Sequence, residues 1–87
     1  MKPPATPASD IGEELFLHSL KPEHIVVLVP EHTNTAITAW VTHIGRDCAL
    51  FHAGLIRTTL GLLADKQGAF FDDQHRRIHV HRYQGAI

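Results

Sequence analysis

The chain has 87 residues, of which 44% are hydrophobic and 20% are charged, and its formal net charge is −1 with histidine neutral. This length predicts one small domain, because a second core would have too little apolar surface to bury. A single cysteine, Cys48, excludes an internal disulfide, and the uncharged runs are shorter than the roughly 20 residues that span a bilayer, so we expect a cytoplasmic protein with no membrane contact.

The first nine residues, MKPPATPAS, contain three prolines and no large aliphatic side chain after Met1. Such a segment cannot bury enough apolar surface to offset the entropy lost on ordering. We therefore predict a disordered, proline-rich tail over residues 1–9 and a single globular domain over residues 10–87.

Residues 9–22 predict a short helix. Asp10 suits the N-cap, Glu13 completes a capping box, and Pro22 ends the segment. Gly12 lowers the helix propensity. On balance the capping signals favour a helix that packs against the rest of the domain.

The remainder of the chain shows the patterns of antiparallel strands separated by turn signals every 8 to 11 residues. Residues 55–66 fit either a helix or a strand, and adjacent threonines with a central glycine favour a strand. The predicted fold is α+β but mainly β, with the short helix packed on a bent meander of five or six strands that can close as a small barrel. The other predicted strands are residues 24–30, 35–45, 48–54, 69–72 and 76–83.

The last predicted strand carries the sequence RRIHVHRY. Side chains alternate along a strand, so Ile78 and Val80 are predicted to enter the core. The opposite face would then present Arg77, His79, His81 and Tyr83. We predict that this face, or the edge of this C-terminal hairpin, binds a protein partner or a second copy of the chain.

A transition-metal site is the first alternative. His79 and His81 share a face about 6.6 Å apart, near enough to reach one zinc or nickel ion. If the hairpin before Cys48 turns on Gly45 and Arg46, His43 lies across from Cys48 and supplies the other half of a tetrahedral site. An interpretation without metal, in which Cys48 is a buried thiol and the histidines are solvated, is favoured over the metal site.

A second alternative is a small barrel that binds single-stranded nucleic acid through the same arginine, histidines and tyrosine. A sequence pI near 6.7 does not favour it. We expect no enzymatic activity, because the sequence shows neither a nucleophile with a neighbouring base nor a glycine-rich phosphate loop. The eight histidines also suggest a pH-responsive assembly, and Trp40 is predicted to lie in the core.

Overall fold

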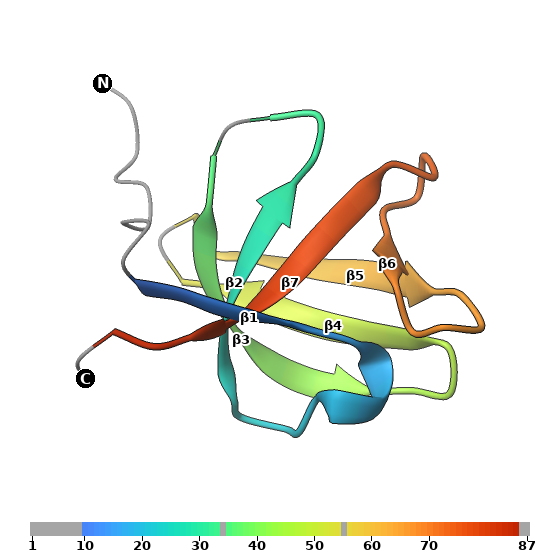
Figure 1. Ribbon diagram of the computed structural model, residues 1–87, viewed down its shortest axis with the longest axis horizontal. Coiled ribbons are helices and arrows are strands. Elements are labelled where there is room, and N and C mark those ends of the chain that lie inside the picture. The colour runs from blue at the N-terminus through green and yellow to red at the C-terminus, as the bar shows by residue number, and fades with distance from the viewer. Residues whose placement is uncertain (1–9, 34, 55, 86–87) are drawn as a thin grey trace.

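The computed structural model describes residues 10–33, 35–54 and 56–85. They form a closed antiparallel barrel of six strands, β2 to β7, to which β1 is added along β7 (Figure 1). The strand order is β1-β7-β2-β3-β4-β5-β6, and pairing of β6 with β7 closes the barrel. The elements are β1 (Ile11–Leu15), η2 (Leu17–Ser19), β2 (Ile25–Pro30), β3 (Ile37–Ile44), β4 (Cys48–Ala53), β5 (Thr58–Ala64), β6 (Phe70–Phe71) and β7 (Arg77–Tyr83).

The core is built from alternate side chains of the strands, as the period-two pattern predicts. Phe51 and Phe70 are almost fully buried and meet edge to face, with ring centroids 5.7 Å apart. Ile78 and Val80 of β7 enter the same core, as predicted. The other buried members are Leu15, Leu20, Val26, Leu28, Ala39, Val41, Ala49, Ala53 and Leu62.

The predicted N-terminal helix is wrong. Residues 11–15 form β1, and a single 3-10 turn, η2, follows; the described ranges contain no α-helix. A helix of about ten residues is marginal without tertiary support, whereas β7 offers β1 a free edge from Val80 to Tyr83. Gly12 permits this pairing, because a Cβ there would lie 2.9 Å from the carbonyl oxygen of Arg82.

The predicted strands are confirmed within the described ranges, including the ambiguous segment, which forms β5 from Thr58 onward. The prediction for residues 1–9 lies outside the described residues. Two turns, at residues 65–69 and 72–76, share one design: an aspartate Oδ1 accepts the amides two and four residues later. In each, the fourth residue has a positive φ, 85° at Gly68 and 60° at His75.

A β-bulge in β3 changes the register of its hairpin with β4. Val41 pairs with Phe51 but His43 pairs with Leu50, so Thr42 is the extra residue. Because of the bulge, Val41 and Ile44 both point inward. Trp40 points outward with 42% of its surface exposed, so its predicted place in the core is wrong.

Candidate functional site

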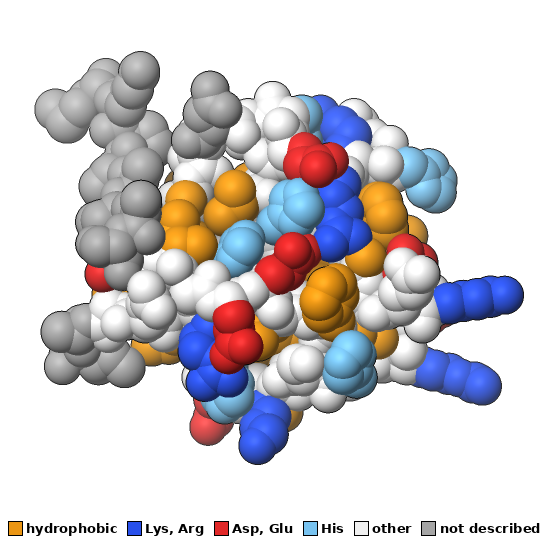
Figure 2. Space-filling model, viewed as in Figure 1, with side chains coloured by type: hydrophobic (Ala, Val, Ile, Leu, Met, Phe, Trp, Pro, Cys, Tyr) orange, Lys and Arg blue, Asp and Glu red, His pale blue; other side chains and the backbone are white. Residues whose placement is uncertain are grey.

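A network of charged side chains covers the outer face of β7. Nη2 of Arg77 donates a hydrogen bond to Oε2 of Glu14 at 2.6 Å, and Nδ1 of His79 donates to the same oxygen at 2.9 Å. Nε2 of His79 lies 3.1 Å from Oε1 of Glu31, just beyond β2. Figure 2 shows this face, with histidines lying between acidic and basic side chains over β7. One imidazole therefore joins the carboxylates of two segments that flank β7.

These contacts shift two pKa values. The hydrogen bond to Glu14, followed by that to Glu31, raises the pKa of His79 above its ordinary value. Burial alone would raise the pKa of Glu14, but the hydrogen bonds from His79 and Arg77 outweigh it and lower that pKa. A carboxylate can only accept, so both ring nitrogens of His79 carry protons when both bonds form. The network therefore favours a charged imidazolium between two ionised glutamates.

The predicted binding residues share the outer face of β7, but they are not freely available. Arg77 and His79 are held by Glu14 and Glu31, and Arg77 also lies over the ring of Phe71, with Cζ 5.6 Å from the centroid. Nδ1 of His81 donates to the carbonyl oxygen of Gly12 at 3.0 Å. All four predicted residues are half-buried, including Tyr83. Their role in partner binding stays a prediction.

The structure does not bring the four predicted metal ligands together. The hairpin turns on Arg46 and Asp47 and not on Gly45 and Arg46, so His43 lies opposite Leu50. The amide of Gly45 donates to the carbonyl oxygen of Cys48, and Cys48 pairs on its other side with Leu63. The rings of His79 and His81 do lie near each other, with centroids 6.3 Å apart. Within the described ranges, no group of three or more histidine, cysteine or acidic side chains is arranged to hold a metal ion.

In contrast to the charged outer face of β7, the outer side of β2, β3, β4 and β5 carries no carboxylate, ammonium or guanidinium group. These four strands contain no aspartate, glutamate, lysine or arginine. We call the surface formed by the outward side chains of these four neighbouring strands the uncharged face. Its members are Ile25, Val29, Thr38, Trp40, Thr42, His43, Cys48, Leu50, His52, Thr59, Gly61 and Leu63, whereas Val27 of the same strands is fully buried.

Trp40 lies in the middle of a row across the uncharged face. Its neighbours in register are Ile25 on β2 and His52 on β4, which pairs in turn with Thr59 on β5. The rings of Trp40 and His52 are tilted by 51° with centroids 4.5 Å apart, and Nδ1 of His52 lies 3.3 Å from Oγ1 of Thr59. Ile25 is 37% exposed, so the row is uncharged and combines the apolar side chains of Ile25 and Trp40 with the polar pair of His52 and Thr59.

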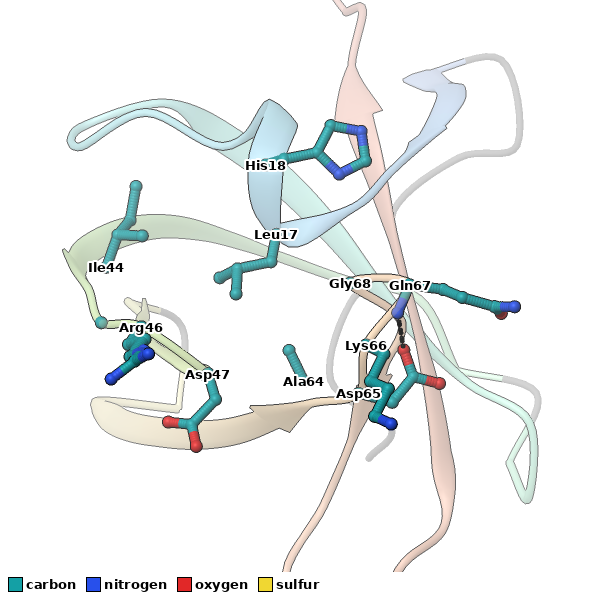
Figure 3. Close-up of a pocket in the computed structure, with 11 residues that line it drawn as sticks. Leu17, His18, Ile44, Arg46, Asp47, Ala64, Asp65, Lys66, Gln67 and Gly68 are labelled. Carbon is teal, nitrogen blue, oxygen red and sulfur yellow. Dashed lines mark hydrogen bonds between the residues drawn. The ribbon is translucent and has the colours of Figure 1, made fainter.

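A groove of about 810 Å³ opens at one end of the barrel (Figure 3). Leu17, Ile44 and Ala64 form apolar walls, and Figure 3 shows Lys66 and Gln67 directed away from the hollow. The carboxylate of Asp65 is already used by its own turn. The lining also contains His18 from η2 and Arg46 and Asp47 from the turn between β3 and β4. A small-molecule site needs a few polar groups that converge on the ligand, and the described contacts join none of these three side chains to one another.

No family model, curated protein or solved structure matches this chain. None of the described helices is long and apolar enough to cross a membrane. The function is therefore inferred from the residues of the chain itself.

Neither the ion network on β7 nor the uncharged face was predicted from the sequence. The ion network depends on Glu14 and Glu31, which lie far from His79 in the sequence and reach it only because β1 and β2 flank β7. The uncharged face had a readable signal, since charged residues are missing from the outward as well as the inward positions of the four strands.

Proposed function

We propose that this chain is a non-enzymatic module that binds a protein partner through the uncharged face, with Trp40 at the centre of the contact. The observation that carries this proposal is the lack of charged residues over four neighbouring strands around an exposed tryptophan. The centres of protein interfaces are depleted in charge and enriched in tryptophan, which often supplies much of the binding free energy.

The chemistry of the face indicates the chemistry of the partner. A buried charge on the partner would find no counterion here and would lose its hydration. The side chains of Leu50 and Leu63, 38% and 50% exposed, flank the Trp40 row and add apolar area. The expected partner is therefore an uncharged, apolar protein segment. Nucleic acid is less favoured, because the face offers phosphates no lysine or arginine.

The hairpin face on β7 is the weaker candidate for the same function. A partner that used Arg77 or His79 would have to displace Glu14 or Glu31, and would lose charge-assisted hydrogen bonds already formed within the chain. Contacts on the uncharged face require no such exchange.

Selection of random displayed peptides against the full chain tests this proposal. Selected peptides are synthesised, labelled and titrated with wild-type protein and with Trp40→Ala, with Glu13→Ala as a matched surface control on β1. We expect Trp40→Ala to weaken binding about tenfold or more, since tryptophan at an interface centre is commonly worth more than about 1.4 kcal/mol, and Glu13→Ala to leave it unchanged. The selected peptides should be poor in charged residues.

Two outcomes would contradict the proposal. Peptides that bind Trp40→Ala as well as wild type, but lose affinity in Arg77→Ala, would place the binding surface on the β7 hairpin. Salt-dependent binding of a single-stranded oligonucleotide, with no selectable peptide, would favour the nucleic-acid function instead.

A further inference from the structure

Among the described residues, the outer edge of β5 is mostly unpaired. β5 pairs with β4 from Thr58 to Leu63, but it pairs with β6 only at Leu63 and Ala64. The amide of Ala64 points toward the β4 side, where it donates to the carbonyl oxygen of Asp47 at 2.7 Å. Alternate residues of a strand direct their amide and carbonyl groups to the same side. The backbone groups of Thr59 and Gly61 therefore face the open edge, and both residues are exposed.

This edge lacks the features that usually prevent strands from pairing between molecules. Proteins protect free edges with charged side chains, proline or a bulge. The outer edge of β1 has such protection, since Glu13 lies on it and its pairing is irregular between Ile11 and Glu14. The segment of β5 from Thr58 to Leu62 has no charge, no proline and an unbroken register with β4.

We infer that the chain forms a twofold symmetric dimer in which β5 pairs antiparallel with β5 of a second copy. The direction of the open groups fixes the register. Thr59 lies opposite Gly61 of the second copy and exchanges two backbone hydrogen bonds with it, and the symmetry axis repeats this pair. Leu60 then faces Leu60 of the second copy across the axis. In this register the open backbone groups of both Thr59 and Gly61 form hydrogen bonds to the second copy, and Leu63 keeps its pairing with Phe71.

The ends of the open edge fit a second β5. Arg57 has a φ of 51° in the turn that precedes β5, so the incoming strand begins at Thr58. In the proposed register, Thr58 of the second copy lies opposite Leu62, and its Arg57 reaches the end of β6. The chain continues there into Asp72 and Asp73, so a cation of one copy approaches acids of the other.

Dimerisation through β5 goes beyond the proposed function and does not depend on it. The paired strands would join β4 and β5 of both copies into one continuous sheet. Two uncharged faces would then lie on the same side of one assembly, which would allow one dimer to hold two partner segments. Trp40→Ala is expected to weaken peptide binding and to leave the dimer intact.

Cysteine cross-linking tests the register directly. In a Cys48→Ser background, Leu60→Cys places two thiols across the axis in a non-hydrogen-bonded pair, with Cα atoms about 4.5 Å apart, within the range of a disulfide. Thr58→Cys is the matched control, because its twin would lie about 13 Å away at the rise of a strand. We expect a covalent dimer from Leu60→Cys and little from Thr58→Cys, although Thr58 is the more exposed.

Sedimentation equilibrium of the full chain supplies a second, independent test. Thr59→Pro removes an amide that has no sheet partner within the described chain, and Thr59→Ala keeps it. We expect the dimer dissociation constant to rise by about tenfold or more in Thr59→Pro and to stay within about twofold in Thr59→Ala.

A wild-type monomer at about 1 mM protein would overturn the inference, since so weak an association falls at the limit of specific binding. Equal cross-linking of Leu60→Cys and Thr58→Cys would also overturn it. If Thr59→Pro does not fold by circular dichroism, the cross-linking result decides alone.

Discussion

Oε2 of Glu14 lies 2.9 Å from Nδ1 of His79, although 65 positions separate the two residues in the chain. This contact joins β1 to the outer face of β7 in the segment where local signals predict a helix. Because His79 also binds Glu31, one imidazole connects both strands that flank β7. The stability of this part of the barrel should therefore depend on pH and on the two carboxylates.

The pH dependence follows from the direction of each pKa shift. The pKa of His79 is raised in the folded state, so its contribution is fully present below the unfolded pKa of about 6.5 and is lost as pH rises through the folded pKa. The pKa of Glu14 is lowered, so its contribution is present above about pH 4.3 and is lost as pH falls through the folded pKa.

The network should therefore stabilise the fold most between about pH 4.5 and 6.5. Urea unfolding of wild type and His79→Gln across a pH series measures this contribution. We expect the difference in unfolding free energy to be largest in that window and to shrink above it. A difference that stays constant from about pH 5.5 to 8.5 would show that the imidazolium contributes nothing.

Glu14→Gln should destabilise the protein more than Glu31→Gln. The Glu14 side chain is 29% exposed and accepts from two cationic groups, whereas the Glu31 side chain is 61% exposed and accepts from one. After allowance for partial screening, we expect a loss of about 1 kcal/mol for Glu14→Gln and less than about 0.5 kcal/mol for Glu31→Gln. Urea unfolding near pH 6 measures both, and equal losses would argue against the central role of Glu14.

The two aspartate turns both favour glycine at their fourth position. A Cβ at Gly68 would lie 2.9 Å from the backbone nitrogen of Leu17, and φ there is 85°, so Gly68→Ala should cost about 1 to 3 kcal/mol. His75 has a φ of 60° in the equivalent position of an exposed turn, so His75→Gly should gain about 0.5 kcal/mol. Thermal melts compare both with wild type, and a destabilised His75→Gly would contradict the equivalence of the turns.

Zinc and nickel should leave the melting temperature unchanged at pH 7.5. His79 already binds two carboxylates, and the β3–β4 turn on Arg46 and Asp47 places His43 opposite Leu50 and not opposite Cys48. A metal that binds only the folded state must raise the melting temperature, so chelator-treated protein with and without metal gives a direct test. A rise that disappears in His79→Gln or His81→Gln would restore the metal-binding function predicted from the sequence.

The strands and turns could be predicted because their signals are local. Alternation placed Ile78 and Val80 inward, and turn residues separated the strands at regular intervals. Local signals also explain the error over residues 9–22. Asp10 and Glu13 suit a helix start, but the free edge of β7 supplies backbone hydrogen bonds that a short helix cannot match.

The register of β3 and the position of Trp40 could not be predicted in the same way. A strand pattern states that alternate residues differ in exposure, but which face is buried depends on the sheet that forms around it. Thr42 is absorbed in a bulge, which shifts the pairing of β3 with β4 by one residue from His43 onward. No periodicity in the sequence indicates where such an extra residue falls.

The sequence by itself determined that most of this chain is antiparallel strand, that Ile78 and Val80 belong to the core, and that β2 to β5 lack charged residues. These properties depend only on residue type and on the alternation of side chains. The tertiary structure decided that Glu14 and Glu31 meet at His79, that Trp40 lies outside, and that β6 covers only the end of β5. Such relationships depend on which strands become neighbours, and pairing between distant segments is set by the packing of the whole barrel.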